Sequence, residues 1–153
     1  MAYYLFVAMD VARGKETVSG IDIVSTLLKE GFWAFSESAP IVPRLRRGDT
    51  VIVYLGGRER HWFVAHCRIA SRFSTDVDDH KTKVLEELGL SFMKRIVEFD
   101  KVTFFKKPVG IIPIKDRLSF IADKKNYGLS LRLPVREIPS EDYQFILNEA
   151  NKS

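Results

Sequence analysis

The chain has 153 residues, of which 46% are apolar, so it can bury one substantial core. Its 24 Lys and Arg residues outnumber its 20 Asp and Glu residues, a mild excess that is compatible with a polyanionic partner. The single cysteine, Cys67, excludes a disulfide framework and suits a reducing cytoplasm. No apolar run approaches the roughly 20 residues of a membrane span. We therefore expect one domain over residues 1–153 that does not enter a membrane.

The first part of the chain predicts strand, helix and strand. Residues Tyr3 to Met9 are continuously apolar, which is typical of a strand buried on both faces. Ser19 and Asp22 have the spacing of a capping box, in which the serine oxygen accepts a free N–H of the first helical turn. Apolar residues then recur at helical spacing up to Gly31, where the helix should end. Residues 32–35 follow as a short strand.

Residues 48–71 predict a β-hairpin. GDTVIVYLGG contains a turn, a strand and a Gly-Gly turn, and HWFVAHCRIAS returns as the partner strand. Alternate residues of the second strand divide into an apolar face and a more polar face. The apolar face carries Phe63, Ala65, Cys67 and Ile69, and the other face carries Trp62, Val64, His66 and Arg68.

Two more helices are predicted in the second half of the chain. Asp78 or Asp79 can cap a helix that ends at Gly89. The last helix should begin at Pro139 or Ser140, where the following acidic residues suit the positive end of the helix dipole. Its apolar stripe consists of Tyr143, Ile146, Leu147 and Ala150.

Further strands lie between these helices. Residues 94–105 alternate like a strand but lose phase near Asp100, as a bulge would cause. Residues 109–114 can form a short edge strand, because Pro113 cannot donate to a ladder. About six strands with two or three helices predict an α+β fold, a small mixed β-barrel flanked by short helices.

The sequence shows no pattern that commits it to catalysis. Three histidines and one cysteine lack the spacing of zinc ligands. There is no GxGxxG after a strand, no P-loop and no GxSxG elbow, and Gly56-Gly57 is explained by the hairpin turn. We therefore predict no metal, no cofactor and no catalytic residue.

Aromatic and basic residues instead occur together in two segments. The groups are Phe32, Trp33 and Phe35 followed by Arg44, Arg46 and Arg47, and Lys124 and Lys125 followed by Tyr127. A protein that holds an unstacked base needs flat rings for the base and cations for the adjacent phosphates. In the plainer alternative, which this pattern by itself favours, the phenylalanines are core and the lysines are solvated turn residues.

Residues 118–127, LSFIADKKNY, and residues 136–146, REIPSEDYQFI, are similar to the closing signature of the EVE domain, a family of the PUA-like superfamily. Upstream, FWAFSE, the Gly48-Asp49 turn and FVAHCRIAS fall where that family has its Trp segment, its Gly-Asp turn and its central strand. The resemblance covers nearly the whole chain. The chain departs from the family in having Tyr127 where Trp is usual and no aromatic in DVARGKETVSG.

The resemblance implies a PUA-like barrel that reads a modified base in DNA or RNA. We expect one pocket lined by Trp33, Phe35, Ser119, Phe120 and Tyr127, and phosphate contacts on its rim from Arg46, Arg47, Lys124 and Lys125. The Ser119 hydroxyl would bond a base edge, and Gly128 would free the backbone beside Tyr127. EVE domains are known from modification-dependent restriction systems, so a fused or associated nuclease or motor subunit is a further expected partner.

Two other functions are compatible with the sequence. Some PUA-like relatives resemble small amidohydrolases that act on modified nucleosides, and such a site would need a buried lysine or carboxylate, for which Lys115, Lys125 and Glu37 are candidates. A protein-interaction domain that uses the acidic last helix is the other alternative. Binding of a nucleic acid ranks first.

Overall fold

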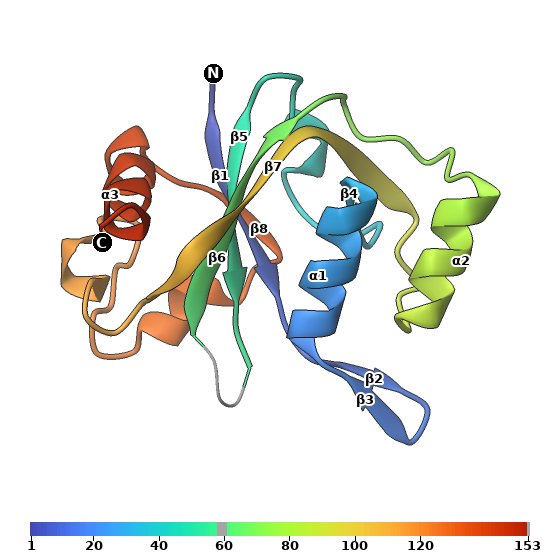
Figure 1. Ribbon diagram of the computed structural model, residues 1–153, viewed down its shortest axis with the longest axis horizontal. Coiled ribbons are helices and arrows are strands. Elements are labelled where there is room, and N and C mark those ends of the chain that lie inside the picture. Colours follow the sequence, from blue (N-terminus) through green and yellow to red (C-terminus); the bar gives the residue numbers. More distant parts are fainter. Residues whose placement is uncertain (58–60, 153) are drawn as a thin grey trace.

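The computed structural model describes residues 1–57 and 61–152. Within them, one sheet contains the six strands β1 (Tyr3–Ala8), β4 (Phe32–Phe35), β5 (Thr50–Leu55), β6 (Trp62–Ile69), β7 (Arg95–Gly110) and β8 (Val135–Glu137). The strand order is β4-β7-β6-β5-β1-β8, with β1 and β5 parallel and the other neighbours antiparallel. The sheet curls into a half-barrel (Figure 1). The predicted α+β fold with a mixed, barrel-like sheet is confirmed.

β1 lies between β5 and β8 and is buried on both faces because the sheet has a core on each side. Successive side chains of a strand point to opposite faces. Phe6 accordingly packs into one apolar cluster with Trp33 and Phe35. Leu5 packs into a second cluster with Tyr54 and with the last helix. This double burial explains the continuous apolar run at the start of the chain.

β6 keeps the predicted alternation of buried and more exposed residues, but its pairing with β5 shifts after Val53. The predicted apolar face is divided at this bulge: Ala65 and Cys67 pack into the cluster of Phe6, whereas Phe63 packs into the cluster of Tyr54. Phe63, Ala65 and Cys67 are buried, whereas Trp62 and Arg68 on the alternate face are exposed. β6 therefore contributes buried side chains to both cores of the sheet, and the bulge is what turns Phe63 toward the second one.

β7 is longer than the sequence indicated. Its pairing with β6 shifts once near Asp100, where a bulge was predicted, and again where Ala65 pairs with Phe104 and Phe63 pairs with Val109. The second bulge absorbs the residues between Phe104 and Val109, so the strand continues to Gly110. The predicted separate edge strand at residues 109–114 is therefore wrong: it begins as the end of β7, and residues 111–114 form a turn.

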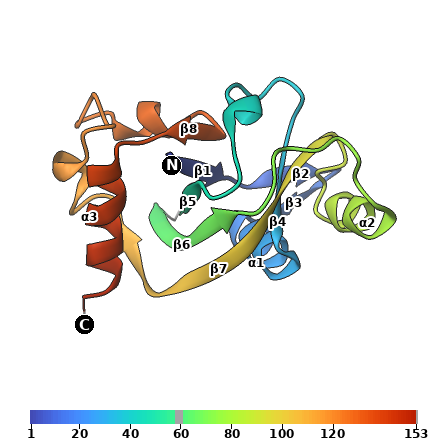
Figure 2. The same cartoon turned by 90° about the horizontal axis from the view of Figure 1, so that it is seen from above.

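Three α-helices are found in the described residues, α1 (Gly20–Glu30), α2 (Asp79–Glu87) and α3 (Ser140–Ala150). The Ser19 hydroxyl accepts from the Asp22 N–H at 3.2 Å, and the Asp78 carboxylate accepts from the Lys81 N–H at 2.8 Å, so both predicted caps form. α3 lies at one end of the molecule, with α1 and α2 toward the other (Figures 1 and 2). None of the helices in the described part of the chain is long and apolar enough to cross a membrane.

A small hairpin of β2 (Val11–Arg13) and β3 (Glu16–Val18) projects from the sheet in a segment for which the sequence predicted no element (Figure 1). Gly14 occupies the turn with a φ of +63°, a conformation that glycine adopts without strain. The Arg13 guanidinium contacts Glu16 at 2.9 Å and donates to the carbonyl of Glu87, which ties the hairpin to the end of α2.

Candidate functional site

A cavity of about 110 Å³ lies at the carboxyl end of β1, between α1, β4 and residues 90–93. We call it the Trp33 cavity, because Trp33 and Phe35 line it together with apolar residues of α1. The Trp33 side chain is only 4% exposed, and its ring lies 6.0 Å from that of Phe6. The aromatic wall of this cavity is therefore also part of the core.

Met9 and Phe92 line the same cavity but are largely accessible to solvent. Their side chains are 51% and 54% exposed. Methionine is unbranched with three rotatable bonds, and neither side chain is fixed by complete burial, so both can turn aside at low cost. The Trp33 cavity thus has a rigid wall and a mouth that can adapt to what enters.

A second cavity, of about 520 Å³, is formed where β5 ends against the 3₁₀ segment Tyr127–Leu131. We call it the Tyr127 cavity. Tyr54, His61 and Tyr127 supply its aromatic rings, and Met9 lines it as well as the Trp33 cavity. Its volume falls within the range of about 300–1,000 Å³ that is typical of ligand sites.

The side chains of Lys115, His61 and Arg132 lie around Tyr127 and its cavity. The Lys115 ammonium lies 5.4 Å from the ring centroid and donates to the carbonyl of Lys124 at 2.7 Å. The His61 ring meets Tyr127 edge-on at a centroid distance of 6.1 Å, and Arg132 lines the cavity. A cation within about 6 Å of a ring centroid is attracted to the ring face, so Lys115 helps to hold Tyr127 in place.

Tyr54 lines the Tyr127 cavity with a side chain that is 1% exposed. Its hydroxyl is buried and has no hydrogen-bond partner in residues 1–57 and 61–152. Burial, and secondarily the neighbouring Tyr127, raise the pKa of Tyr54 above its ordinary value, so the hydroxyl keeps its proton. An unsatisfied buried hydroxyl costs about 1–3 kcal/mol, which makes Tyr54 a candidate partner for a polar ligand atom.

Glycine shapes the backbone beside this cavity. A Cβ on Gly56 would lie 2.7 Å from the Met9 sulfur, so a larger residue would displace Met9. Gly57 has a φ of +118°, which a side chain would strain. These constraints extend the role of the Gly-Gly pair beyond the predicted hairpin turn.

Ser119 and Phe120 lie in neither of these two cavities. The carboxylate of Asp142, on α3 and 3% exposed, accepts from the Ser119 N–H at 3.0 Å, from its hydroxyl at 3.1 Å and from the Phe120 N–H at 2.8 Å. The Ser119 hydroxyl is thus engaged in holding the loop to the last helix. The sequence did not indicate this, because Asp142 is 23 residues away along the chain.

Trp33 and Tyr127 are not brought into one pocket, since each lines a different cavity. Phe35 stays with Trp33. Gly128 lies in the 3₁₀ segment without a positive φ, so the expected need for glycine there is not found. Met9, Tyr54 and Phe92 line the cavities without having been predicted from the sequence, because no local signal distinguishes them from ordinary apolar residues of strands and turns.

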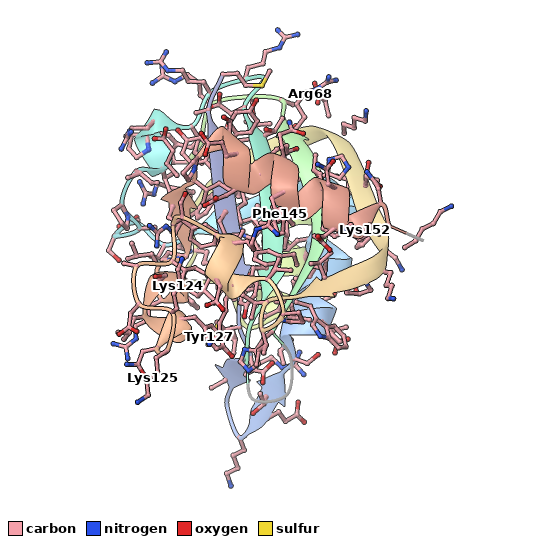
Figure 3. The ribbon with its side chains drawn as sticks, turned by 90° about the vertical axis from the view of Figure 1, so that its left-hand side faces the viewer. Arg68, Lys124, Lys125, Tyr127, Phe145 and Lys152 are labelled. Atoms are coloured by element: carbon pink, nitrogen blue, oxygen red, sulfur yellow. The ribbon has the colours of Figure 1, made fainter. Side chains whose placement is uncertain are left out.

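The four predicted phosphate contacts are divided between two regions. Lys124, Lys125 and Tyr127 lie close together (Figure 3). Arg46 and Arg47 instead lie just before β5, whose first residue, Thr50, pairs with Arg68. Figure 3 shows Arg68 at the opposite end of the molecule from Lys125. The six residues of β5 span about 20 Å at the usual rise of a strand, so the two pairs do not border one cleft.

The residues considered for catalysis do not gather. Glu37 and Lys125 are exposed and line neither of these cavities, and Lys115 is engaged by the Tyr127 ring and the Lys124 carbonyl. In the described part of the chain, no group of three or more His, Cys, Asp or Glu side chains is placed to hold a metal ion. The two cavities offer stacking and apolar contact instead.

The sequence of residues 15–149 matches the family model of the EVE domain. The chain belongs to the EVE domain family. A search of curated proteins found no match to the chain. The family assignment made from the C-terminal third of the sequence is thereby confirmed.

Solved structures share the fold of this EVE domain over nearly its whole length. Human THYN1, in complex with DNA containing 5-methylcytosine, is 15% identical, with 100% of this chain and 99% of that chain covered and a TM-score of 0.66. The Rhodopseudomonas palustris protein Rpa0253 is 17% identical, with coverages of 98% and 93% and a TM-score of 0.59. The YTH domain of Zygosaccharomyces rouxii MRB1, in complex with N6-methyladenosine RNA, is 12% identical, with coverages of 99% and 87% and a TM-score of 0.58. At these identities the likeness shows the fold, which is PUA-like.

Proposed function

We propose that this EVE domain binds a nucleic acid and holds one modified base in the Trp33 cavity. Family membership supports the proposal, as does the shared fold with two proteins whose structures contain methylated DNA or methylated RNA. The observation that carries it is an apolar cavity with Trp33 in its wall and the exposed side chains of Met9 and Phe92 at its mouth. A flat base and a small apolar substituent match that lining.

The energetics favour entry of an already unpaired or easily unpaired base. Extruding a base from a duplex costs a few kcal/mol, and stacking on an aromatic ring returns about 1–3 kcal/mol. At about 110 Å³ the Trp33 cavity accepts a substituent and part of a ring. Met9 and Phe92 therefore have to turn aside to admit a whole base, and Phe92 can then stack on it.

Cations near the cavities supply sequence-independent affinity in this proposal. Lys124 and Lys125 contact phosphates near the Tyr127 cavity, and Arg46 and Arg47 contact others about 20 Å away, beyond the opposite end of β5. That separation corresponds to about six phosphates at the ~3.4 Å axial spacing of one duplex strand. Binding should accordingly weaken with salt.

A binding role is preferred to the amidohydrolase alternative because of where its candidate groups lie. Exposed Lys125 and Glu37 line neither cavity, and Lys115 faces the Tyr127 ring. The domain would then supply recognition alone. A nuclease or motor subunit, fused or associated, would act on the strand that the domain selects.

Phe92→Ala tests the proposal with little risk to folding, since the side chain is 54% exposed. Affinity is measured for short DNA and RNA strands that carry cytosine, 5-methylcytosine, adenine or N6-methyladenine. We expect wild type to prefer one modified strand and Phe92→Ala to lose about tenfold in affinity for it. Phe104→Ala, a matched change at a 47% exposed phenylalanine of β7, should bind like wild type.

Trp33→Phe complements this change because it keeps an aromatic ring in the wall while altering its shape. It should change the preference between modified and unmodified strands. Folded Phe92→Ala and Trp33→Phe variants that bind every strand as wild type does would contradict the proposed role of the Trp33 cavity.

A further inference from the structure

The Tyr127 cavity is the larger of the two, about 520 Å³ against about 110 Å³, and it is not needed to hold the base proposed for the Trp33 cavity. Met9 contributes to the lining of both. The two cavities are therefore neighbours, and Met9 lies where they meet. A ligand that fills both would pass over a flexible side chain rather than over rigid backbone.

The lining of the Tyr127 cavity suits a planar heteroaromatic group with an anionic substituent. Tyr127 offers a ring at the side, and the exposed Leu129 adds apolar surface. Arg132 lines the cavity, and the Lys115 ammonium is held 5.4 Å from the Tyr127 centroid. Bases stack on such rings irrespective of sequence, and the cations suit a phosphate.

Tyr54 adds a feature that a purely apolar cavity would lack. Its buried hydroxyl has no partner in the described residues and keeps its proton, so it is available as a hydrogen-bond donor. A carbonyl oxygen or an unprotonated ring nitrogen of a base would satisfy it. Because the hydroxyl is buried beside Tyr127, the Tyr127 ring has to shift as the base enters.

We infer that the Tyr127 cavity binds the base of a second nucleotide, next in the strand to the one whose base enters the Trp33 cavity. The inference rests on the proposed function. Unpaired bases of one strand can be splayed apart, and here they would lie on either side of Met9. The domain would then read a modified base together with the identity of one neighbour, through the hydrogen bond from Tyr54.

Tyr54→Phe is the decisive variant, because it removes the hydroxyl and keeps the ring. Strands are compared in which the nucleotide on either side of the modified base carries a normal base or is abasic. We expect Tyr54→Phe to weaken binding about tenfold when the neighbouring base is present and to have no effect when that position is abasic. Tyr4→Phe, at another buried tyrosine that lines neither cavity, should bind like wild type.

Tyr127→Leu provides a second measurement, which does not depend on the Tyr54 hydroxyl. This variant should bind strands with a normal base and strands with an abasic site next to the modified base equally well. If Phe92→Ala weakens binding but Tyr54→Phe and Tyr127→Leu do not, the inference is overturned and the proposed function stands. If Phe92→Ala and Trp33→Phe have no effect, the proposed function itself fails. The placement of a neighbouring nucleotide in the Tyr127 cavity would also be overturned by a free mononucleotide, if it bound the wild type as tightly as the strand does and bound Tyr54→Phe more weakly.

Discussion

The Trp33 cavity and the Tyr127 cavity share Met9 but are built in different ways. The first is walled by a strand and a helix whose side chains belong to the core, and the 4% exposed Trp33 packs near Phe6. The second is walled by a strand end and a 3₁₀ segment, with Tyr127 only partly buried. An aromatic wall made of core residues therefore couples ligand binding to the stability of the fold. A wall made of loop residues can be changed with little loss of stability.

Trp33→Ala should show this coupling most strongly. Removing a buried tryptophan is expected to lower the free energy of unfolding by about 3–5 kcal/mol, because the side chain leaves a cavity in the core. Chemical denaturation measures the loss. Tyr127→Ala, measured in parallel, should cost far less. Equal losses for both variants would break the distinction between the two cavities.

Asp142→Ala should produce the next largest effect, by detaching the loop that leads toward Tyr127. The change leaves the N–H groups of Ser119 and Phe120 without their acceptor, and bonds of this charged kind are worth about 1.5–3 kcal/mol. Glu141→Ala, at the exposed acidic neighbour on α3, is the control. An unfolding free energy that matches this control would show that the loop does not depend on Asp142.

Replacing Lys124 and Lys125 together by Ala removes the positive charges beside the Tyr127 cavity and keeps those of Arg46 and Arg47, beyond the other end of β5. The logarithmic salt dependence of strand binding should fall by about two, with no change in base preference. Arg46→Ala with Arg47→Ala tests the other pair on a longer strand. An unchanged slope for the lysine pair would remove these lysines from the phosphate contacts.

Tyr54→Phe should make the smallest change to the pH dependence of unfolding, and that change should be confined to alkaline pH. Burial raises the pKa of Tyr54 above its ordinary value of 10.0, so the folded protein holds this proton more tightly than the unfolded chain does. The resulting stabilisation is complete below about pH 10 and is lost as pH rises through the folded-state pKa. Denaturation midpoints at increasing pH should fall less steeply for Tyr54→Phe than for wild type, and parallel curves would contradict this.

Much of the fold was predictable because it depends on local patterns. The caps at Ser19 and Asp78, the alternating burial along β6 and the apolar stripe of α3 follow from turn chemistry and from periods of two and 3.6 residues. The hairpin β2–β3 was missed because its short strands are mostly exposed and have no apolar alternation.

The sequence by itself determined the three α-helices, most strands of the main sheet, the family and the presence of aromatic residues beside cations. Only the tertiary structure decided which of them meet. Trp33 and Tyr127 line separate cavities, the Ser119 hydroxyl bonds Asp142, and the lysine and arginine pairs lie toward opposite ends of β5. Each outcome depends on strand direction and on packing between segments far apart in sequence, which local periodicity does not encode. The buried hydroxyl of Tyr54 is the clearest case, because the cavity that this residue lines is closed by residues 126–132, which are distant from β5 in the sequence.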